Sequence, residues 1–344
     1  MRLLFDVLHP AHVHIFRHLA QRTMAEGGAV LFTARAKDVT LDLLRHEGLP
    51  HEELTAIGGG MLGLGRELAV RTGKLALRVR SFKPDLMLGI MGPVIAPLGR
   101  LMGVPSWVLY DTETATLTNR YVYPLCDRLY LPDAYRGPAP RKARRYPGYH
   151  ELAYLHPDRF EADPGVRAEA GLGADEPFAV VRIVSWEASH DVGDTGFSDP
   201  VGFVHALSQR IRVVVSGERG VPDALRPFAL KLPPWRIHHL LAAADLYVGE
   251  GATMAAEAAV LGTPAVFVHT ARLGYMLELE ERYRLLWNTP SQERAAELVA
   301  GLLDDLVATR REWAERRAHM LTERIDVAAY LWDEVQAFGA GHRR

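Results

Sequence analysis

The segment from residue 245 to 269, DLYVGEGATMAAEAAVLGTPAVFVH, joins a glycine-containing turn to a helix of small residues. The first N–H groups of a helix lack intrahelical partners and lie at the positive end of its dipole, so they attract phosphate oxygens. After Glu250, the residues Gly251, Ala252 and Thr253 are small enough to let a diphosphate approach the backbone. Glu257 follows one turn later on the same helix face, where its carboxylate can accept hydrogen bonds from two vicinal hydroxyls. The turn predicts a nucleotide diphosphate site, although close packing of a small-residue helix on a sheet would give the same pattern.

Three histidines follow the first apolar run of the chain, in the segment HPAHVHIF. Histidine exchanges protons near neutral pH, so each is a candidate general acid or base. We favour His12 for this role, with His14 as a rival, while His9 suits a helix cap. Zinc binding is the weaker alternative because no nearby carboxylates or thiolates complete a ligand set.

Two carboxylates separated by one residue, Asp111 and Glu113, follow the apolar run 105–110. Paired acids of this kind can act as general acid and base when burial separates their pKa values. The alternative is that they cap a helix beginning near Ala115. The sequence favours the two interpretations equally.

The segment SWEASHDVGD, residues 185–194, follows the apolar run 178–184. It places His190 beside an acid, so we expect this histidine to act as an oriented acid or to contact a phosphate oxygen. The alternative is that its serine and aspartate only cap backbone groups. Ser185, and Ser216 and Gly217 at the end of the run 211–216, are expected to line the same nucleotide site.

The apolar runs that precede these residues are predicted to be parallel strands, because they alternate with helical patterns. Ligands of such sheets bind at the carboxyl ends of the strands. The pattern restarts after about residue 164, so we predict two α/β halves with a cleft between them. Besides the 245–269 crossover, the predicted strands are 2–8, 29–33, 50–54, 86–90, 105–110, 127–131, 178–184, 211–216 and 225–232, with 132–148 as an exposed loop.

The composition indicates a globular protein and restricts its partners. The chain has 344 residues, 48% of them hydrophobic, and a formal net charge of −2, which does not suggest nucleic-acid binding. A single cysteine, Cys126, excludes an intrachain disulfide and a thiolate zinc cluster, and indicates a reducing cytoplasm. No apolar segment approaches the length of a membrane span, and the run from Met1 to Leu8 is too short for a signal peptide.

Residues 58–83 join the apolar, glycine-rich loop GGGMLGLG to a basic helix. Its only acid is Glu67, against the cations Arg66, Arg71, Lys74, Arg78, Arg80 and Lys83. A solvated helix face is the simpler interpretation. The same residues suit peripheral contact with an anionic membrane or acceptor, which would place the protein at the inner face of the membrane.

The motifs HPAHVH, YHELAYLHP at 149–157, VSWEASHDVGD and GEGATMAAEAAVLGTP together resemble an uncharacterised family of predicted GT-B glycosyltransferases. The last motif is also distantly similar to non-hydrolysing UDP-N-acetylglucosamine 2-epimerases. That resemblance implies that Glu250 to Thr253 form the phosphate turn, that Glu257 binds the ribose, and that the Asp111–Glu113 region and the loop of His190 supply acid/base groups. It also implies a GT-B fold of two Rossmann-type domains, 1–155 and 156–324, with a C-terminal helix within 325–344 that returns to the first.

These expectations favour a metal-independent glycosyltransferase that uses a nucleotide-diphosphate-sugar, UDP-linked, and a sugar or lipid-linked acceptor in polysaccharide or glycolipid biosynthesis. His12, Asp111 or Glu113 would deprotonate the acceptor hydroxyl, while the turn at Gly251 and His190 stabilise the leaving diphosphate. Two alternatives stay open. One is a nucleotide-sugar 2-epimerase, and the other is a binding protein that does not turn the nucleotide-sugar over.

Overall fold

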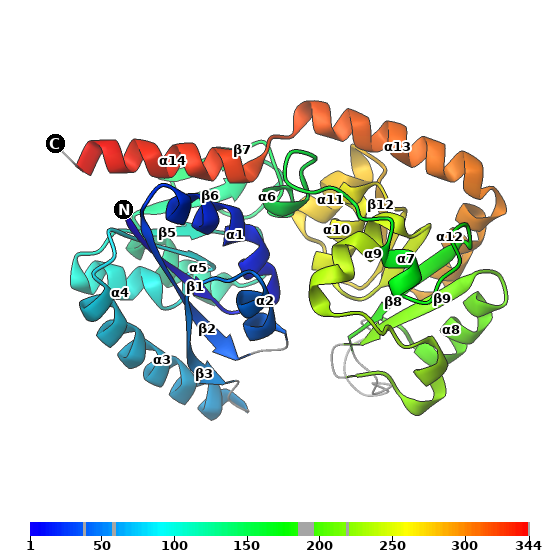
Figure 1. Ribbon diagram of the computed structural model, residues 1–344, viewed down its shortest axis with the longest axis horizontal. Helices are drawn as coiled ribbons and strands as arrows, with labels where there is room; N and C mark the ends of the chain where they lie inside the picture. The colour runs from blue at the N-terminus through cyan, green and yellow to red at the C-terminus, as the bar shows by residue number, and fades with distance from the viewer. Residues whose placement is uncertain (37–38, 57–59, 185–195, 218–219, 343–344) are drawn as a thin grey trace. The chain divides into compact units, whose positions relative to one another are not determined.

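The computed structural model describes residues 1–36, 39–56, 60–184, 196–217 and 220–342. The chain divides into two compact units, which are described separately below (Figure 1). Unit 1 contains Met1–His156 and Ile325–Arg344, and unit 2 contains Pro157–Arg324. The sequence had suggested a division between residues 155 and 156.

Unit 1 is built on a seven-stranded sheet of order β3-β2-β1-β4-β5-β6-β7, in which every pair of neighbours is parallel. Its central strands are apolar on both faces because helices cover both, and Leu3, Leu4 and Phe5 of β1 are fully buried. The chain leaves β1 first toward β2 and β3 and later toward β4, so a topological switch point lies between β1 and β4. The strands are β1 (Arg2–Val7), β2 (Ala29–Ala36), β3 (His51–Ala56), β4 (Leu86–Ile90), β5 (Ser106–Leu109), β6 (Arg128–Pro132) and β7 (Ala143–Tyr146).

The edge strand β7 corrects the sequence prediction, which had an exposed loop over 132–148. Tyr130 and Leu131 of β6 pair with Arg144 and Arg145 of β7. Both arginines are exposed, as an edge strand allows, so the segment lacks the apolar run that identifies a central strand.

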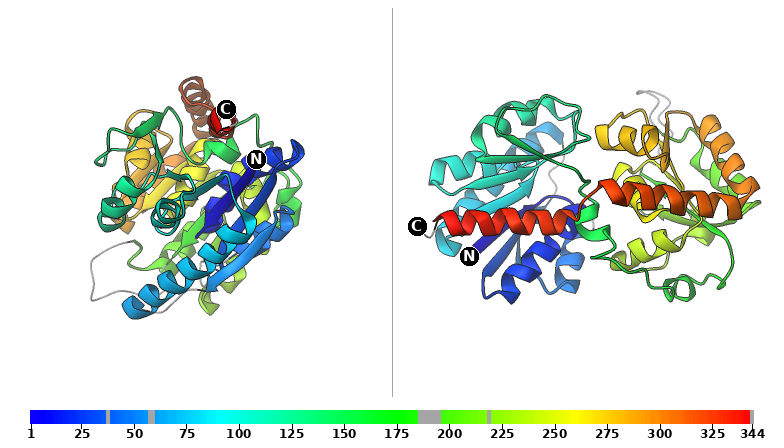
Figure 2. Two further views of the ribbon diagram at one scale, coloured as in Figure 1. Left: turned by 90° about the vertical axis from the view of Figure 1, so that its left-hand side faces the viewer. Right: turned by 90° about the horizontal axis from the view of Figure 1, so that it is seen from above.

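The helices of unit 1 include a return of the chain at its C-terminus. Helix α14 packs against α1 and α6, and Figure 2 shows it in red beside α1 in blue. Phe338 of α14 meets the ring of Trp107 edge-on at 5.3 Å, and Tyr330 stacks on Tyr146 at 5.5 Å. The helices are α1 (Pro10–Ala25), α2 (Thr40–His46), α3 (Gly60–Phe82), α4 (Ile95–Met102), α5 (Thr116–Leu125), α6 (Leu152–Leu155) and α14 (Val327–His342).

Helix α3 has a buried face and an exposed face. Leu75 and Val79 pack into the core of unit 1, whereas Leu77 is 63% exposed. Arg71 lies on the buried side, so the expectation that all cations of this helix lie on a solvated face is wrong for Arg71. None of the helices in the described part of the chain is long and apolar enough to cross a membrane.

Unit 2 is built on a five-stranded parallel sheet of order β12-β11-β10-β8-β9. Its strands are β8 (Phe178–Ile183), β9 (Arg212–Gly217), β10 (Leu246–Gly249), β11 (Ala265–Val268) and β12 (Leu286–Thr289). Around them lie α7 (Val166–Glu169), α8 (Pro200–Ser208), α9 (Ile237–Ala243), α10 (Ala252–Leu261), α11 (Gly274–Glu281), α12 (Gln292–Asp304) and α13 (Leu306–Glu323), with short 3₁₀ helices η1 (Asp223–Phe228) and η2 (Pro234–Arg236).

The strand predicted over 225–232 is wrong. The 3₁₀ helix η1 occupies Asp223–Phe228, and only an isolated bridge joins Ala229 to Val215 of β9. Pro227 explains the difference, because proline cannot donate a hydrogen bond to a strand ladder.

Candidate functional site

In unit 2, β10 ends at Gly249 and α10 begins after the N-cap residue Gly251. A side chain at Gly249 would place its Cβ 2.6 Å from the carbonyl oxygen of Arg182, so close packing of β10 on β8 requires glycine. The Tyr247 hydroxyl donates to the Gly251 carbonyl oxygen over 3.2 Å and fixes the turn. Gly262, at a φ of 87°, ends the helix in the left-handed conformation that the sequence Gly-Thr-Pro predicts.

The N-terminus of α10 presents backbone N–H groups without a side-chain cap within the described chain. Gly251 has no side chain to accept them, and Gly251, Ala252 and Thr253 are partly exposed. An anion placed there would receive hydrogen bonds and lie at the positive end of the dipole. The local geometry therefore suits the phosphate turn that the sequence predicts.

Arg182 is a cation at this turn that the sequence analysis missed. A Cβ built on Gly251 would lie 3.5 Å from Cγ of Arg182. The Arg182 guanidinium donates through Nη1 to the Ser216 hydroxyl over 2.8 Å, at the end of β9. Ser216 and Gly217, both predicted site residues, are partly exposed there. The signal was available, because Arg182 is the one charged residue of the apolar strand FAVVRI.

The Glu250 carboxylate accepts hydrogen bonds from backbone N–H groups of unit 2. Its Oε2 accepts the N–H of Val184 over 2.7 Å, and its Oε1 accepts the N–H of Phe197 over 2.9 Å. One carboxylate thus holds both ends of the segment 185–195. Ser185 and His190, which the sequence assigned to nucleotide binding and to catalysis, lie in that segment, outside the described residues.

Glu257, the predicted ribose ligand, is buried in α10. Its Oε1 lies 3.0 Å from Nε2 of His238 on α9, a pairing that the sequence analysis did not find. Both side chains are almost fully buried. This bond fixes the orientation of the Glu257 carboxylate, and its contact with a ribose stays a prediction.

In unit 1, Asp111 follows β5 and pairs with His150, a residue that the sequence analysis had not assigned to the site. Oδ2 of Asp111 lies 2.9 Å from Nδ1 of His150, which is only 4% exposed, whereas the Asp111 side chain is 18% exposed. The Thr112 hydroxyl donates to Oδ1 of Asp111 over 3.0 Å. Two donors therefore hold this carboxylate from two sides.

The charges of this pair stabilise each other against the cost of burial. Burial raises the pKa of Asp111, but the His150 charge and hydrogen bond outweigh it and leave that pKa below its usual value. Burial lowers the pKa of His150, but Asp111 outweighs it and leaves the imidazole pKa above its usual value. Asp111 is thus an ionised, partly exposed carboxylate at the end of a strand.

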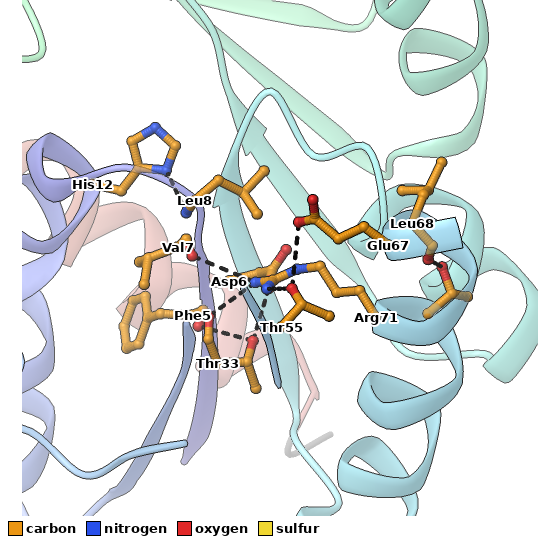
Figure 3. A network of polar contacts seen from close by, with 11 residues as sticks. Phe5, Asp6, Val7, Leu8, His12, Thr33, Thr55, Glu67, Leu68 and Arg71 are labelled. Atoms are coloured by element: carbon orange, nitrogen blue, oxygen red, sulfur yellow. Dashed lines mark hydrogen bonds and ion pairs between the residues drawn. The ribbon is translucent and has the colours of Figure 1, made fainter. Parts of the chain in front are cut away.

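His12, the favoured histidine, uses one of its ring nitrogens to accept a backbone hydrogen bond, so that nitrogen is not free to accept a proton. Its Nδ1 accepts the N–H of Leu8 over 3.2 Å (Figure 3), so a neutral ring carries its proton on Nε2. In this form Nε2 can donate a hydrogen bond but cannot take a proton. His12 also lies close enough to lower the pKa of Asp111 by its charge. The geometry favours Asp111 over His12 as the base.

The other histidines of this segment have structural contacts. Nδ1 of His9 accepts the N–H of Ala11 over 3.2 Å and caps α1, which confirms the capping interpretation. His14 is buried and stacks on Tyr154 with ring centroids 5.3 Å apart.

Glu113 does not cap a helix. Helix α5 begins at Thr116 with Ala115 as its N-cap, so the capping alternative for Asp111 and Glu113 is wrong. Oε1 of Glu113 instead accepts the N–H of Arg136 over 3.0 Å. Of the two predicted acids, Glu113 holds a loop and Asp111 is held by donors around it.

A buried ion pair lies close to His12 on the same strand ends (Figure 3). Arg71 of α3 pairs with Asp6 of β1, and both side chains are 2% exposed. Arg71 also donates to the carbonyl oxygen of Thr33 over 3.2 Å and to the hydroxyl of Thr55 over 3.3 Å. The pair therefore fastens α3 to β1, β2 and β3, and β1 is the strand that leads to Leu8 and His12.

Comparison with protein families matches residues 1–284 to a family described as "Protein of unknown function (DUF354)". Comparison with curated proteins finds no match.

Solved structures match over nearly the whole chain. The glycosyltransferase SsfS6 from Streptomyces sp. SF2575, complexed with thymidine diphosphate, is 16% identical over 96% of this chain and 99% of its own, with a TM-score of 0.62. The glycosyltransferase VinC in complex with dTDP is 13% identical over 99% and 100%, with a TM-score of 0.65. A protein from Listeria monocytogenes described as a UDP-N-acetylglucosamine 2-epimerase is 10% identical over 100% and 96%, with a TM-score of 0.68. These likenesses confirm the predicted GT-B type of fold, with two parallel sheets.

Proposed function

The chain belongs to the DUF354 family of proteins of unknown function, and we propose that it is a glycosyltransferase with a nucleotide-diphosphate-sugar donor. The observation that carries the proposal is the uncapped N-terminus of α10 with Arg182 beside it. A diphosphate bound there gains hydrogen bonds from backbone N–H groups and an ion pair with a guanidinium. The SsfS6 and VinC structures both contain thymidine diphosphate (dTDP), which supports a nucleoside diphosphate as the ligand.

Asp111 is the proposed general base. It accepts the proton of an acceptor hydroxyl, and the hydroxyl oxygen forms a bond to the anomeric carbon of the donor sugar. The bond between that carbon and the diphosphate oxygen breaks, and its electron pair stays on the diphosphate. The N-terminus of α10 and Arg182 stabilise the added negative charge, with His190 as a further candidate. Ser216 and Gly217 would line the diphosphate site, and Glu257 would bind the ribose.

Titration calorimetry with UDP, dTDP and GDP tests the donor site. We expect saturable binding, tightest for UDP, and a Kd raised about ten-fold to a hundred-fold in Arg182→Ala, because the variant loses charge-assisted hydrogen bonds. Arg210→Ala is the matched control, since this exposed arginine pairs with Asp304 at 3.0 Å on the surface. If none of the three nucleotides saturates, or if Glu257→Ala binds as tightly as the wild type, the proposed site is refuted.

Metal removal tests how the leaving group is stabilised. The positive charge in the proposed site comes from the helix dipole and a guanidinium, so we propose a metal-independent transfer. The rate of sugar transfer should then be the same in excess EDTA as in added Mg²⁺. A rate that falls in EDTA and returns with Mg²⁺ would contradict this part of the proposal.

We propose a lipid-linked acceptor, in polysaccharide or glycolipid biosynthesis at the inner face of the membrane, on the basis of helix α3. Val70, Lys74, Leu77 and Arg80 are exposed on it, which combines apolar and cationic side chains on one surface helix. In a flotation assay with phosphatidylglycerol vesicles, the wild type should rise with the vesicles, whereas Leu77→Asp should stay in the bottom fraction. Val307→Asp is the control, because Val307 is 77% exposed on α13 of unit 2. Equal flotation of the two variants would refute contact through α3.

A second candidate is a nucleotide-sugar 2-epimerase, favoured by the likeness to the Listeria protein. In that reaction an acid/base group removes and returns a proton at carbon 2 of the sugar. Incubation of the nucleotide-sugar in D₂O without an acceptor distinguishes the two. Deuterium at carbon 2 supports the epimerase, whereas a transferase leaves the sugar unlabelled. A protein that binds the nucleotide-sugar but gives neither product would be a binding protein.

A further inference from the structure

Asp111 and His150 form a pair in which one imidazole nitrogen has no hydrogen-bond partner among the described residues. Nδ1 of His150 faces Oδ2 of Asp111 at 2.9 Å. Nε2 of His150 is buried and has no hydrogen-bond partner in the part of the chain that the structure describes. Among the residues that the structure describes, the carboxylate is therefore the only hydrogen-bond partner of the ring.

This arrangement fixes where the proton of a neutral His150 lies. A proton on Nδ1 is held by the Asp111 carboxylate, whereas a proton on Nε2 would be a buried donor without an acceptor in the described part of the chain, which is unfavourable. When the imidazolium loses a proton, it therefore loses the one on Nε2. The Nδ1–H bond to Asp111 is present in both charge states of His150, so the orientation of the carboxylate does not depend on whether His150 is charged.

We propose that His150 is a positioning residue for the general base: its Nδ1–H fixes the Asp111 carboxylate, and its positive charge keeps that carboxylate ionised. This inference rests on the proposed function, in which Asp111 takes the acceptor proton. His150 itself is too deeply buried to meet an acceptor. Because the Thr112 hydroxyl holds the other carboxylate oxygen, the exposed edge of Asp111 is presented in one orientation.

The other titratable groups around the pair act more weakly on it. His12 on α1 lowers the pKa of Asp111 by its charge, after the effects of burial, His150 and Thr112. Glu151, next in the chain, raises the pKa of His150, after the effects of burial and Asp111. Tyr146 of β7 stacks on the His150 ring at 6.5 Å and stays neutral, because burial raises its pKa well above the usual value. His150 is thus the main cation that acts on Asp111.

The test is the pH profile of kcat for sugar transfer in His150→Asn and His150→Leu. Asparagine keeps an amide N–H near the place of Nδ1 but removes the charge, so we expect kcat near the wild-type value at high pH and an acid limb moved to higher pH. Leucine removes both the N–H donor and the charge, so kcat should fall at least ten-fold at all pH values while KM changes little. Tyr146→Phe is the control, because it changes the stacked neighbour and removes only a buried hydroxyl without a partner. An acid limb in His150→Asn that coincides with the wild type overturns the proposal.

A second measurement separates this inference from the proposed function. The carboxyl ¹³C signal of Asp111, followed by NMR against pH, should titrate at higher pH in His150→Asn than in the wild type. If it does, and Asp111→Asn is as active as the wild type, the proposed role of Asp111 fails while the pairing stands. If Asp111→Asn is inactive but neither the titration nor the acid limb moves in His150→Asn, the positioning role fails and the transferase stands. Should His150→Leu not fold, His150→Asn alone decides.

Discussion

The strand ends of the two units differ in the charged group that they leave partly exposed. In unit 1, acids meet bases: Asp111 pairs with His150, and Asp6 pairs with Arg71. In unit 2, Glu250 at the turn holds two backbone N–H groups, and the Glu257–His238 pair is almost fully buried in α10 and α9. At the start of α10, backbone N–H groups have no side-chain cap among the described residues, and the cation beside them is Arg182. The first arrangement suits proton transfer, which needs a titratable group, and the second suits a diphosphate, which needs fixed positive charge.

The largest expected effect breaks this comparison at Asp111. Asp111→Asn should lower the transfer rate about 10²-fold to 10⁴-fold, the usual contribution of a general base, and leave nucleotide affinity unchanged. Transfer of radiolabelled sugar and calorimetry measure the two quantities. Asp42→Asn is the control, because Asp42 is an exposed acid in a surface pair with Arg45 on α2. A loss of nucleotide affinity in Asp111→Asn would show that the division of roles is wrong.

The next effect concerns the buried pair of unit 1. Arg71→Met leaves the Asp6 carboxylate buried without its cation, which should destabilise unit 1 by about 3–5 kcal/mol. Hydrogen exchange of peptides from β1 and β2 should accelerate, while peptides from β10 serve as the internal reference. The double variant Asp6→Leu with Arg71→Met should recover much of the loss, since no unpaired charge is left. Equal destabilisation by the double variant would mean that packing, rather than charge, holds α3.

A smaller effect sharpens the structural role given to Glu250. Glu250→Gln replaces one acceptor oxygen by an amide N–H group, which then faces a backbone N–H of Val184 or Phe197. The lost bond should destabilise unit 2 by about 1–3 kcal/mol. Hydrogen exchange at β8 and β10 measures it. Unchanged exchange in these peptides, together with a weaker affinity for the nucleotide, would instead make Glu250 a direct ligand.

The smallest effect is the pH dependence of the Asp111–His150 pair, of the order of 1 kcal/mol for one hydrogen bond to a charged group. The pKa of Asp111 is lowered in the folded protein, so its contribution to stability is lost as the pH falls through that lowered value. The pKa of His150 is raised, so its contribution is lost as the pH rises through that raised value. Hydrogen exchange of unit 1 between these limits should be slower than in His150→Asn. A difference that is the same at every pH would exclude the pair as its cause.

The sequence predicted the central elements of both sheets because their cause is local. The apolar run 2–8 and the crossover 245–269 have hydrophobic patterns that predict a strand and a strand–helix–strand unit, and Gly262 predicts the end of α10. The strands β7 and β12 were missed, because each has only four residues and each contains polar ones, Arg144 and Arg145 in β7 and Asn288 and Thr289 in β12. Burial on one face of an edge strand is decided by the rest of the fold and cannot be found from periodicity alone.

The sequence predicted those site residues that follow a recognisable strand or a glycine turn, and it did not predict their tertiary partners. Asp111 was found because it follows β5 directly, and the turn at Gly251 because glycine marks it. His150 follows β7, a strand that the sequence did not reveal, and meets Asp111 only through the tertiary fold. The sequence also could not predict that Glu250 accepts the N–H groups of Val184 and Phe197, because a residue's type does not determine its hydrogen-bond partners.

The attachment of Val184 and Phe197 to one carboxylate has a consequence for how this protein can vary. Both bonds use backbone N–H groups, so they place a requirement on the backbone of Val184 and Phe197 and not on their side chains. Substitutions at either position should therefore leave the two bonds in place, with proline as the exception, because proline has no N–H to donate.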